Sequence, residues 1–332
     1  MPVRFAFTSL ADFPEQIDAP AAVTVSTEIG PYVQEGIALN DGDSVAVNLL
    51  NPITDTDLWM SWWRGNGGTG NTGRFDFFDT AVDAVNPVIR ITGQNDFGGS
   101  IVLQLWNGSS FDTVYTSGDS LNALQQIDWR FVKDNSAGLF QLYRNQSLVS
   151  EVAGIDTDRV AWTQIDRIRI VAGSSAGGDV LRISAFQINT EDTRFKIFIQ
   201  ANNYADGANT DPTGGAAEVD DIAGFNDADV AVFDLDGDRL TMSNDLDGVL
   251  DSGFDIESSV LSVRCNRVGG DPNSIIGVHR VGGTDYLTSS ILLPASATQL
   301  AQFIVSNNPA TASPWLIADL EAAEVGAEAE TV

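Results

Sequence analysis

Short runs in which apolar and polar residues alternate fill most of the chain, and this period-2 pattern predicts β-strands with one buried face. The stretch from Trp129 to Gly154 shows it most clearly. Trp129 and Phe131 alternate with polar positions, a polar loop follows at 133–138, and a second strand leads to Asn145-Gln146. Asn tolerates the left-handed backbone that a tight turn needs, so we predict consecutive hairpins here.

Similar runs recur along the whole chain, separated by clusters of Gly, Asn, Asp and Pro, whereas helical periodicity is almost absent before Pro314. Short, regularly punctuated strands are typical of β-sandwiches and argue against alternating βαβ units. We therefore predict an all-β chain of two jelly-roll-like sandwiches. The further runs are 3–8, 21–27, 36–39, 44–49, 58–63, 74–78, 87–92, 100–106, 111–116, 164–171, 180–188, 194–200, 230–235, 240–242, 259–264, 274–280, 288–293 and 302–305.

The polar segment Asn189–Thr193 interrupts the strand pattern, and we place the domain boundary there, giving domains 1–191 and 192–332. Pro314–Ala323 has Pro at its start and apolar residues at helical spacing, which predicts a short helix. The acidic, alanine-rich segment 321–330 is expected to be a frayed tail.

The hairpins of 129–152, with the strands expected at 164–171 and 180–188, resemble the central and closing strands of concanavalin A-like, laminin-G-like lectin domains. The resemblance covers roughly 2–190. It implies a lectin-like sandwich for the first domain and binding of a glycan or of another protein.

Three pieces of the second half stand out together: Gly282–Tyr286, Asn308–Trp315 with the segment that follows it, and an acidic stretch at 218–229 upstream. They resemble a recurring C-terminal module of tailed-bacteriophage structural proteins. Ala312 stands where that family usually has Gly, and Ile317–Glu321 replaces its usual helix sequence. The resemblance covers roughly 192–326 and implies a role in a phage particle.

The 332 residues carry a net charge of −29. Such an acidic surface repels nucleic acid, so we expect no nucleic-acid partner. No apolar run is long enough to span a membrane, and the N-terminus lacks the pattern of a signal peptide. Cys265 and His279 are each the single residue of their type, so neither a disulfide within the chain nor a two-histidine metal site is expected.

Three tryptophans are candidates for stacking on sugar rings: Trp62 and Trp63 in one strand and Trp106 in another. The alternative for each is a place in the sandwich core. A glycine-rich loop, 64–73, directly follows the first two.

Asp234, Asp236 and Asp238 resemble part of a calcium loop, with Asp245 at its twelfth position. Gly237 falls at the wrong position for an EF-hand, and Asp replaces the bidentate Glu, so an Asp-Gly hairpin turn is the favoured alternative. No other cofactor is expected. Calcium ligands within the lectin-like part remain open among Asp76, Asp79, Asp96 and Asp112.

Glu218 and Asp220 alternate like the catalytic carboxylates of laminarinase-type glycosidases, but Ile222 occupies the position of the third. The sequence contains no Ser-His-Asp set and no phosphate-binding glycine loop. We therefore predict no catalytic residues.

The prediction is a non-enzymatic bacteriophage virion structural protein: a fibre, tail-associated or head-decoration protein. Its expected partners are other virion proteins, further copies of itself with a trimer as first choice, and host-surface glycan; its expected location is the virion. Two alternatives stay open, namely a glycan-active enzyme (a polysaccharide depolymerase or glucanase) and a host-encoded lectin.

Overall fold

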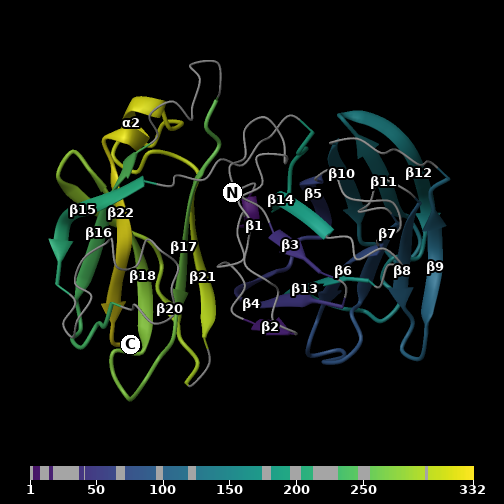
Figure 1. Cartoon of the computed structure of the whole chain (residues 1–332), viewed down its shortest axis with the longest axis horizontal. Coiled ribbons are helices and arrows are strands. Elements are labelled where there is room, and N and C mark those ends of the chain that lie inside the picture. The colour runs from purple at the N-terminus through teal and green to yellow at the C-terminus, as the bar shows by residue number, and fades with distance from the viewer. Residues whose placement is uncertain are drawn as a thin grey trace. The chain divides into compact units, whose positions relative to one another are not determined.

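The computed structural model describes residues 3–7, 15–17, 37–40, 42–64, 72–94, 100–118, 125–173, 181–194, 203–211, 231–245, 255–295 and 298–332. The chain divides into two compact units, Pro2–Gln200 and Ala201–Val332. Strands dominate both units, as predicted, and the all-β fold class is confirmed (Figure 1). No helix within the described ranges has the length and apolar character that crossing a bilayer requires.

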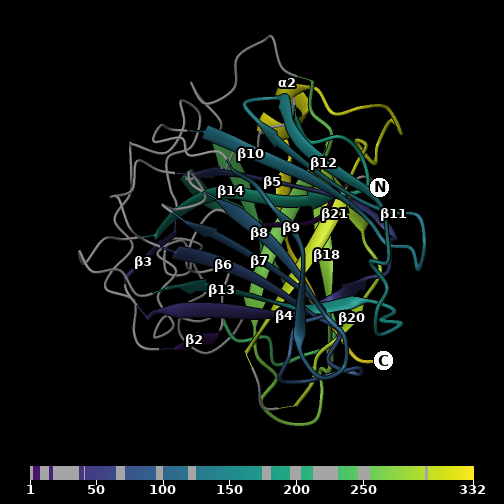
Figure 2. The ribbon, with the colours of Figure 1, turned by 90° about the vertical axis from the view of Figure 1, so that its right-hand side faces the viewer.

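Two antiparallel sheets form the first unit and appear as two layers in Figure 2. Sheet 1 has the order β1 (Val3–Phe7), β14 (Leu181–Asn189), β5 (Asp57–Arg64), β10 (Gln125–Val132), β11 (Gly138–Arg144) and β12 (Ser147–Ile155), with β3 (Ile37–Leu39) also beside β14. Sheet 2 has the order β4 (Ser44–Ile53), β13 (Ile165–Ala172), β6 (Thr72–Phe78), β7 (Ile89–Gln94), β8 (Ile101–Trp106) and β9 (Phe111–Thr116), with β2 (Glu15–Ile17) beside β4.

Aromatic side chains from the facing surfaces of sheets 1 and 2 form the core of the first unit. Trp62 of β5 lies 4.9 Å from Phe75 of β6, measured between ring centroids, and Trp129 of β10 lies 5.7 Å from Phe77. All four side chains are fully buried. Burial of such large rings is the main stabilising contribution available to a sandwich.

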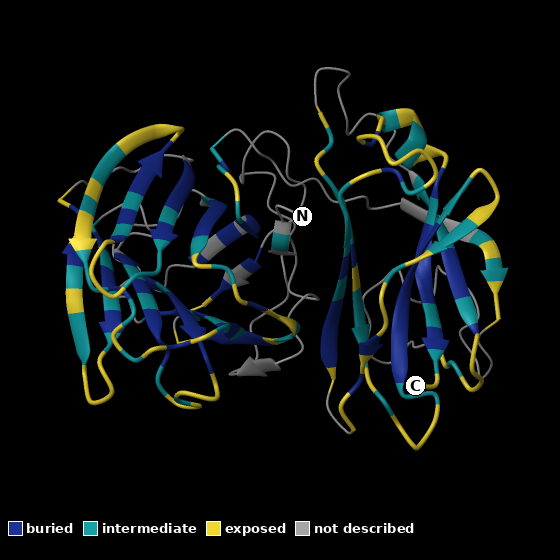
Figure 3. Ribbon diagram, turned by 180° about the vertical axis from the view of Figure 1, so that it is seen from behind, coloured by how far each residue is buried: buried dark blue, intermediate teal, exposed yellow. Residues whose placement is uncertain are grey.

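The predicted turn at Asn145-Gln146 joins β11 to β12, with φ values of 45° and 71°. Positive φ at both central residues is the conformation whose twist matches a two-residue hairpin. The longer connection 107–110 joins β8 to β9 and contains Gly108 with φ of 93°. Buried positions accordingly gather within the strands and exposed positions at the turns (Figure 3).

The second unit is also a sandwich. Sheet 3 has the order β15 (Asn203–Thr210), β16 (Arg239–Asp245), β22 (Glu324–Glu330), β18 (Ser274–Val281) and β19 (Thr284–Leu287), with β20 (Ile291–Leu292) also beside β18. A pair of strands, β17 (Ser259–Cys265) and β21 (Gln299–Val305), packs against it. A Cβ on Gly277 of β18 would lie 2.4 Å from the Phe303 ring of β21, so the close approach of these layers requires glycine.

His279 lies in this core and is 1% exposed. Its Nε2 is 3.4 Å from Ser259 Oγ, and its ring is 6.1 Å from that of Trp315. Burial lowers the pKa of His279 to about 4, so the imidazole is neutral near pH 7. Its place in the core identifies it as a packing residue.

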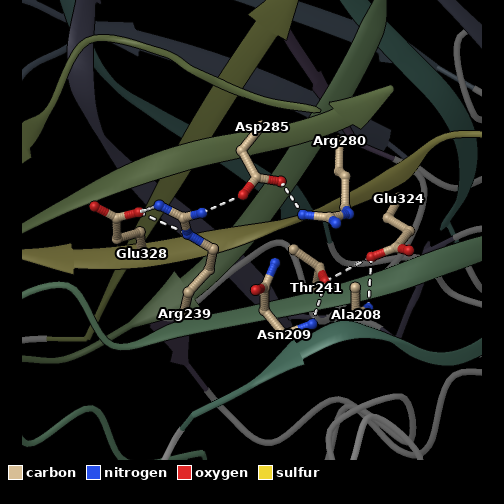
Figure 4. Close-up of polar contacts among 8 residues, drawn as sticks. All are labelled: Ala208, Asn209, Arg239, Thr241, Arg280, Asp285, Glu324 and Glu328. Atoms are coloured by element: carbon tan, nitrogen blue, oxygen red, sulfur yellow. Dashed lines mark hydrogen bonds and ion pairs between the residues drawn. The ribbon is translucent and has the colours of Figure 1, made fainter. Parts of the chain in front are cut away.

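A polar network covers part of the outward face of sheet 3 (Figure 4). The Arg239 guanidinium pairs with Glu328 and Asp285, and Arg280 Nη1 donates to Asp285 at 2.8 Å. Glu324 accepts hydrogen bonds from Thr241 Oγ1 at 2.8 Å and from the Ala208 amide at 2.7 Å. The carboxylates of Glu324 and Glu328 on β22 are thus tied to β15 and β16, and Arg239 links this network to Asp285 of β19.

Three predictions from the sequence are corrected. Segment 321–330 is not a frayed tail, because strand β22 lies there between β16 and β18, with Val325, Ala327 and Ala329 buried. The short helix before it, α2, spans Ile317–Glu321. Residues 231–235 form no strand. In place of one strand at 288–293, β19 and β20 flank residues 288–290. The segments 21–27, 195–200 and 218–229 lie outside the described residues.

The position of β22 can be tested by substitution. Ala327→Glu places a charge in the core of the second unit and should lower its free energy of unfolding by about 3 kcal/mol or more. Glu330→Gln, on the opposite face of the same strand, should change it by less than about 1 kcal/mol. Urea unfolding measures both values, and equal, small effects would mean that this segment is not packed.

Candidate functional site

The outward face of sheet 1 carries polar residues that are nevertheless buried. Asp128, Gln126 and Ser61 are at most 4% exposed. The segment that follows β14 lies over them: Thr193 Oγ1 donates to Asp128 Oδ1 at 2.9 Å, and Gln126 Nε2 donates to the Thr193 carbonyl at 3.2 Å. This face is therefore closed around Asp128 by the chain itself.

Burial raises the pKa of Asp128 to about 6, although hydrogen bonds from Ser61, Thr193 and Gln126 oppose the shift. Asp192 raises it further through charge repulsion. The carboxyl group is fully buried, so its raised pKa belongs to a side chain that no ligand reaches in this structure.

The aromatic residues of the same face are also covered. The rings of Trp59 and Tyr143 stack with centroids 5.6 Å apart. The Arg194 guanidinium lies 4.7 Å from the Tyr143 centroid and 5.7 Å from that of Trp59, and it is paired with Asp192. Both rings are buried, with Trp59 8% and Tyr143 6% exposed, so neither presents a surface for stacking.

The outward face of sheet 2 is different, because three arginines surround one aspartate. Asp76 of β6 is fully buried; its carboxylate is 2.8 Å from Arg90 Nε, 2.6 Å from Arg169 Nη2 and 3.1 Å from Arg74 Nε. We call these four residues the arginine cluster. Alternation places their side chains opposite the core residues Phe75, Ile91 and Ile170 on β6, β7 and β13.

Two of the three guanidinium groups also lie over aromatic rings. Arg90 lies over the ring of Phe111 at 3.9 Å, and Arg169 over that of Phe78 at 5.0 Å. Burial, followed by the charges of Arg90 and Arg169, lowers the pKa of Arg74, while Asp76 opposes the shift. The three guanidinium groups therefore repel one another while each is paired with the Asp76 carboxylate.

Directly beside the cluster, the β8–β9 hairpin presents an aromatic pair with polar neighbours. Trp106 and Phe111 are cross-strand partners, with ring centroids 5.0 Å apart, and each is partly exposed. In the next outward-facing row, Gln104 Nε2 donates to Thr113 Oγ1 at 3.4 Å. We call these four residues the hairpin platform.

The three predicted tryptophans have different positions. Trp62 is 0% exposed and packs against Trp129 and Phe186 in the core, so burial removes it from the candidates for sugar stacking. Trp63 is partly exposed on sheet 1. Among the described residues, Trp106 is the one of the three that lies beside a second partly exposed aromatic residue, Phe111, and polar side chains.

The predicted calcium residues Asp234, Asp236 and Asp238 lie in a turn whose Gly237 has φ of 86°. Asp238 Oδ2 accepts hydrogen bonds from the amides of residues 234 and 235, each 2.9 Å long, and Asp236 Oδ1 accepts one from the Thr331 amide. The described residues contain no group of three His, Cys, Asp or Glu side chains placed to hold a metal ion.

The other aspartates considered as calcium ligands are each bound to different partners within the chain. Asp76 belongs to the arginine cluster, Asp112 pairs with Arg159, and Asp79 accepts the amides of Thr163 and Ala81. Asp96, Glu218 and Asp220 lie outside the described residues.

Sequence reasoning did not identify the arginine cluster. Its signal is the placement of charged residues at alternate strand positions: Arg74 with Asp76 in one strand, and Arg167 with Arg169 in another. That these strands are neighbours is not visible in the alternation itself.

No family model and no curated protein matches the chain. Several solved structures are similar to it. Bacillus licheniformis β-glucanase matches with 8% identity and a TM-score of 0.35, over 54% of this chain and 92% of that protein. A galectin-like protein of unknown function from Bacillus subtilis matches with 11% identity and a TM-score of 0.38, over 57% and 96%. The T. cruzi calreticulin globular domain matches with 10% identity and a TM-score of 0.40, over 57% and 84%. Values this low leave the function to be argued from the residues of the chain itself.

The raised pKa of Asp128 gives a pH test. A native pKa of about 6 against about 3.8 unfolded means that stability falls as pH rises through this range, because the native state binds the proton more tightly. Asp128→Asn has no carboxyl group to ionise, so this loss of stability does not occur in the variant. The free energy of unfolding of Asp128→Asn relative to that of wild type should rise by about 3 kcal/mol between pH 3.5 and pH 8, measured by urea unfolding.

Asp57→Asn removes a partly exposed carboxylate paired with Arg130 on the same sheet and is the matched control for the substitution itself. A constant difference between Asp128→Asn and wild type across the pH range would contradict the burial of an ionisable carboxyl group there.

Proposed function

We propose that the chain is a non-enzymatic virion structural protein of a tailed bacteriophage, and that its first unit binds host-surface glycan at the hairpin platform. The partly exposed Trp106–Phe111 pair carries the proposal. The apolar faces of pyranose rings suit aromatic planes, and adjacent amide and hydroxyl groups supply the hydrogen bonds that orient a sugar. Gln104 and Thr113 provide both kinds of group.

The surroundings of Asp128 support binding without cleavage. A retaining glycosidase needs two carboxyl groups about 5 Å apart, with access for the glycosidic bond between them. The outward positions of β10 are Gln126, Asp128, Arg130 and Val132, which supply a single carboxyl group. Thr193 and Gln126 enclose that group, and the neighbouring Asp192 is paired with Arg194.

The assembly role rests on the sequence resemblance of the second half to a tailed-phage module. In this proposal the second unit joins the chain to other virion proteins or to further copies of itself, with a trimer as the first expectation. A compact tail-associated or head-decoration protein suits two sandwich units better than a full-length tail fibre, which needs a long fibrous segment.

A glycan-active enzyme is the second candidate, and the pKa of Asp128 is the observation in its favour. A carboxyl group with a pKa of about 6 is suited to general acid catalysis. Such an enzyme would have to move residues 190–194 away from Asp128. Release of reducing ends from host polysaccharide by wild type, abolished in Asp128→Asn, would favour it. A host-encoded lectin is distinguished by its gene neighbourhood, which would lack portal and tail genes.

Trp106→Ala tests the proposed site. Loss of the indole should weaken binding of the intact protein to host-surface polysaccharide by about tenfold or more, because a central aromatic residue carries much of the affinity of a small interface. Trp63→Ala, at a partly exposed tryptophan of the other sheet, should leave binding unchanged. Biolayer interferometry on immobilised polysaccharide measures both. A loss with Trp63→Ala alone would move the site to sheet 1.

A further inference from the structure

We infer that the arginine cluster makes the proposed site selective for an anionic glycan, one whose sugars carry carboxylate, sulfate or phosphate groups. This inference rests on the proposed glycan binding and names the class of ligand. Its basis is a local excess of positive charge beside the hairpin platform.

The first step is the charge balance of the cluster. Three guanidinium groups share the single carboxylate of Asp76, and all four groups lie on one face of neighbouring strands. Two positive charges therefore remain uncompensated within the cluster. The whole chain carries a net charge of −29, so its surface as a whole repels polyanions. At physiological salt that repulsion is screened beyond about 8 Å, whereas a contacting anion still interacts with the cluster.

The second step is preorganisation. Asp76 holds Arg90 through Nε, while Phe111 supports the plane of the same guanidinium. Within the described part of the chain, the two Nη groups of Arg90 make no hydrogen bond. Arg169 is held more fully, because it donates to Asp76 through both Nε and Nη2 and lies over the ring of Phe78. Fixed guanidinium forks lose little entropy when they bind an anionic group and match its geometry with paired donors.

The third step is the direct contact between Arg90 and the hairpin platform. Arg90 and Gln104 are cross-strand partners, and the Phe111 ring that Arg90 covers contacts the Trp106 ring at 5.0 Å between centroids, tilted by 53°. A sugar stacked on Trp106 therefore places its substituents near Arg90. An acidic substituent there gains a charge-assisted hydrogen bond, whereas a neutral sugar does not.

The test uses the intact chain with dextran, dextran sulfate, polygalacturonate and a phosphomannan at 150 mM NaCl. We expect at least one of the three charged polymers to bind about tenfold more tightly than dextran, and the one that binds best identifies the anionic group. Arg90→Gln should remove about tenfold of that affinity and Arg90→Lys part of it, because Lys keeps the charge but loses the fork. Arg130→Gln, a paired arginine on sheet 1, should have no effect.

Unfolding midpoints of the variants show whether each remains folded. Arg90→Gln should remain folded, because Asp76 still pairs with Arg74 and Arg169. Equal binding of dextran and the charged polymers, or equal losses in Arg90→Gln and Arg130→Gln, would overturn the inference while Trp106-dependent glycan binding still stands. Failure of every polymer and of host polysaccharide to bind would overturn the proposed function itself. Loss of self-association in Arg90→Gln, with no polymer bound, would assign the cluster to protein contact.

Discussion

The packing of aromatic rings between two sheets is the constraint on which the first unit depends. Trp62, Phe75, Phe77 and Trp129 occupy the space between sheets 1 and 2 and fix the register of the three strands β5, β6 and β10. Because side chains alternate along a strand, this register also determines which residues point outward. Asp76 lies between Phe75 and Phe77 and is therefore presented on the outer face together with its arginines.

Each of the two sheets has a buried carboxyl group on its outward face, and the two groups have opposite surroundings. Asp76 is surrounded by three guanidinium groups, so its charge is compensated and the excess is positive. Asp128 is surrounded by neutral donors, and burial raises its pKa to about 6. The first arrangement leaves an outer face suited to anions, whereas the second closes its face beneath residues 190–194. The difference explains why we place ligand binding on sheet 2.

Alternation and turn chemistry were sufficient to predict the all-β fold and the Asn145-Gln146 turn, because both are local properties of the chain. Strand β22 was missed because its acidic, alanine-rich sequence resembles a tail; only pairing with β16 and β18 makes it a strand. Trp62 and Trp63 are adjacent, so one had to face inward, but alternation alone does not say which. The arginine cluster depends on which strands are neighbours, a long-range property that local patterns do not contain.

Hydrogen exchange on the intact chain, with and without host-surface polysaccharide, tests the central claim most directly. The account predicts slower exchange in β6, β7, β8, β9 and β13 when the polysaccharide is bound, with residues 125–144 and 190–194 unchanged. Protection confined to residues 125–144 and 190–194, or faster exchange at 190–194 as that segment opens over Asp128, would contradict it.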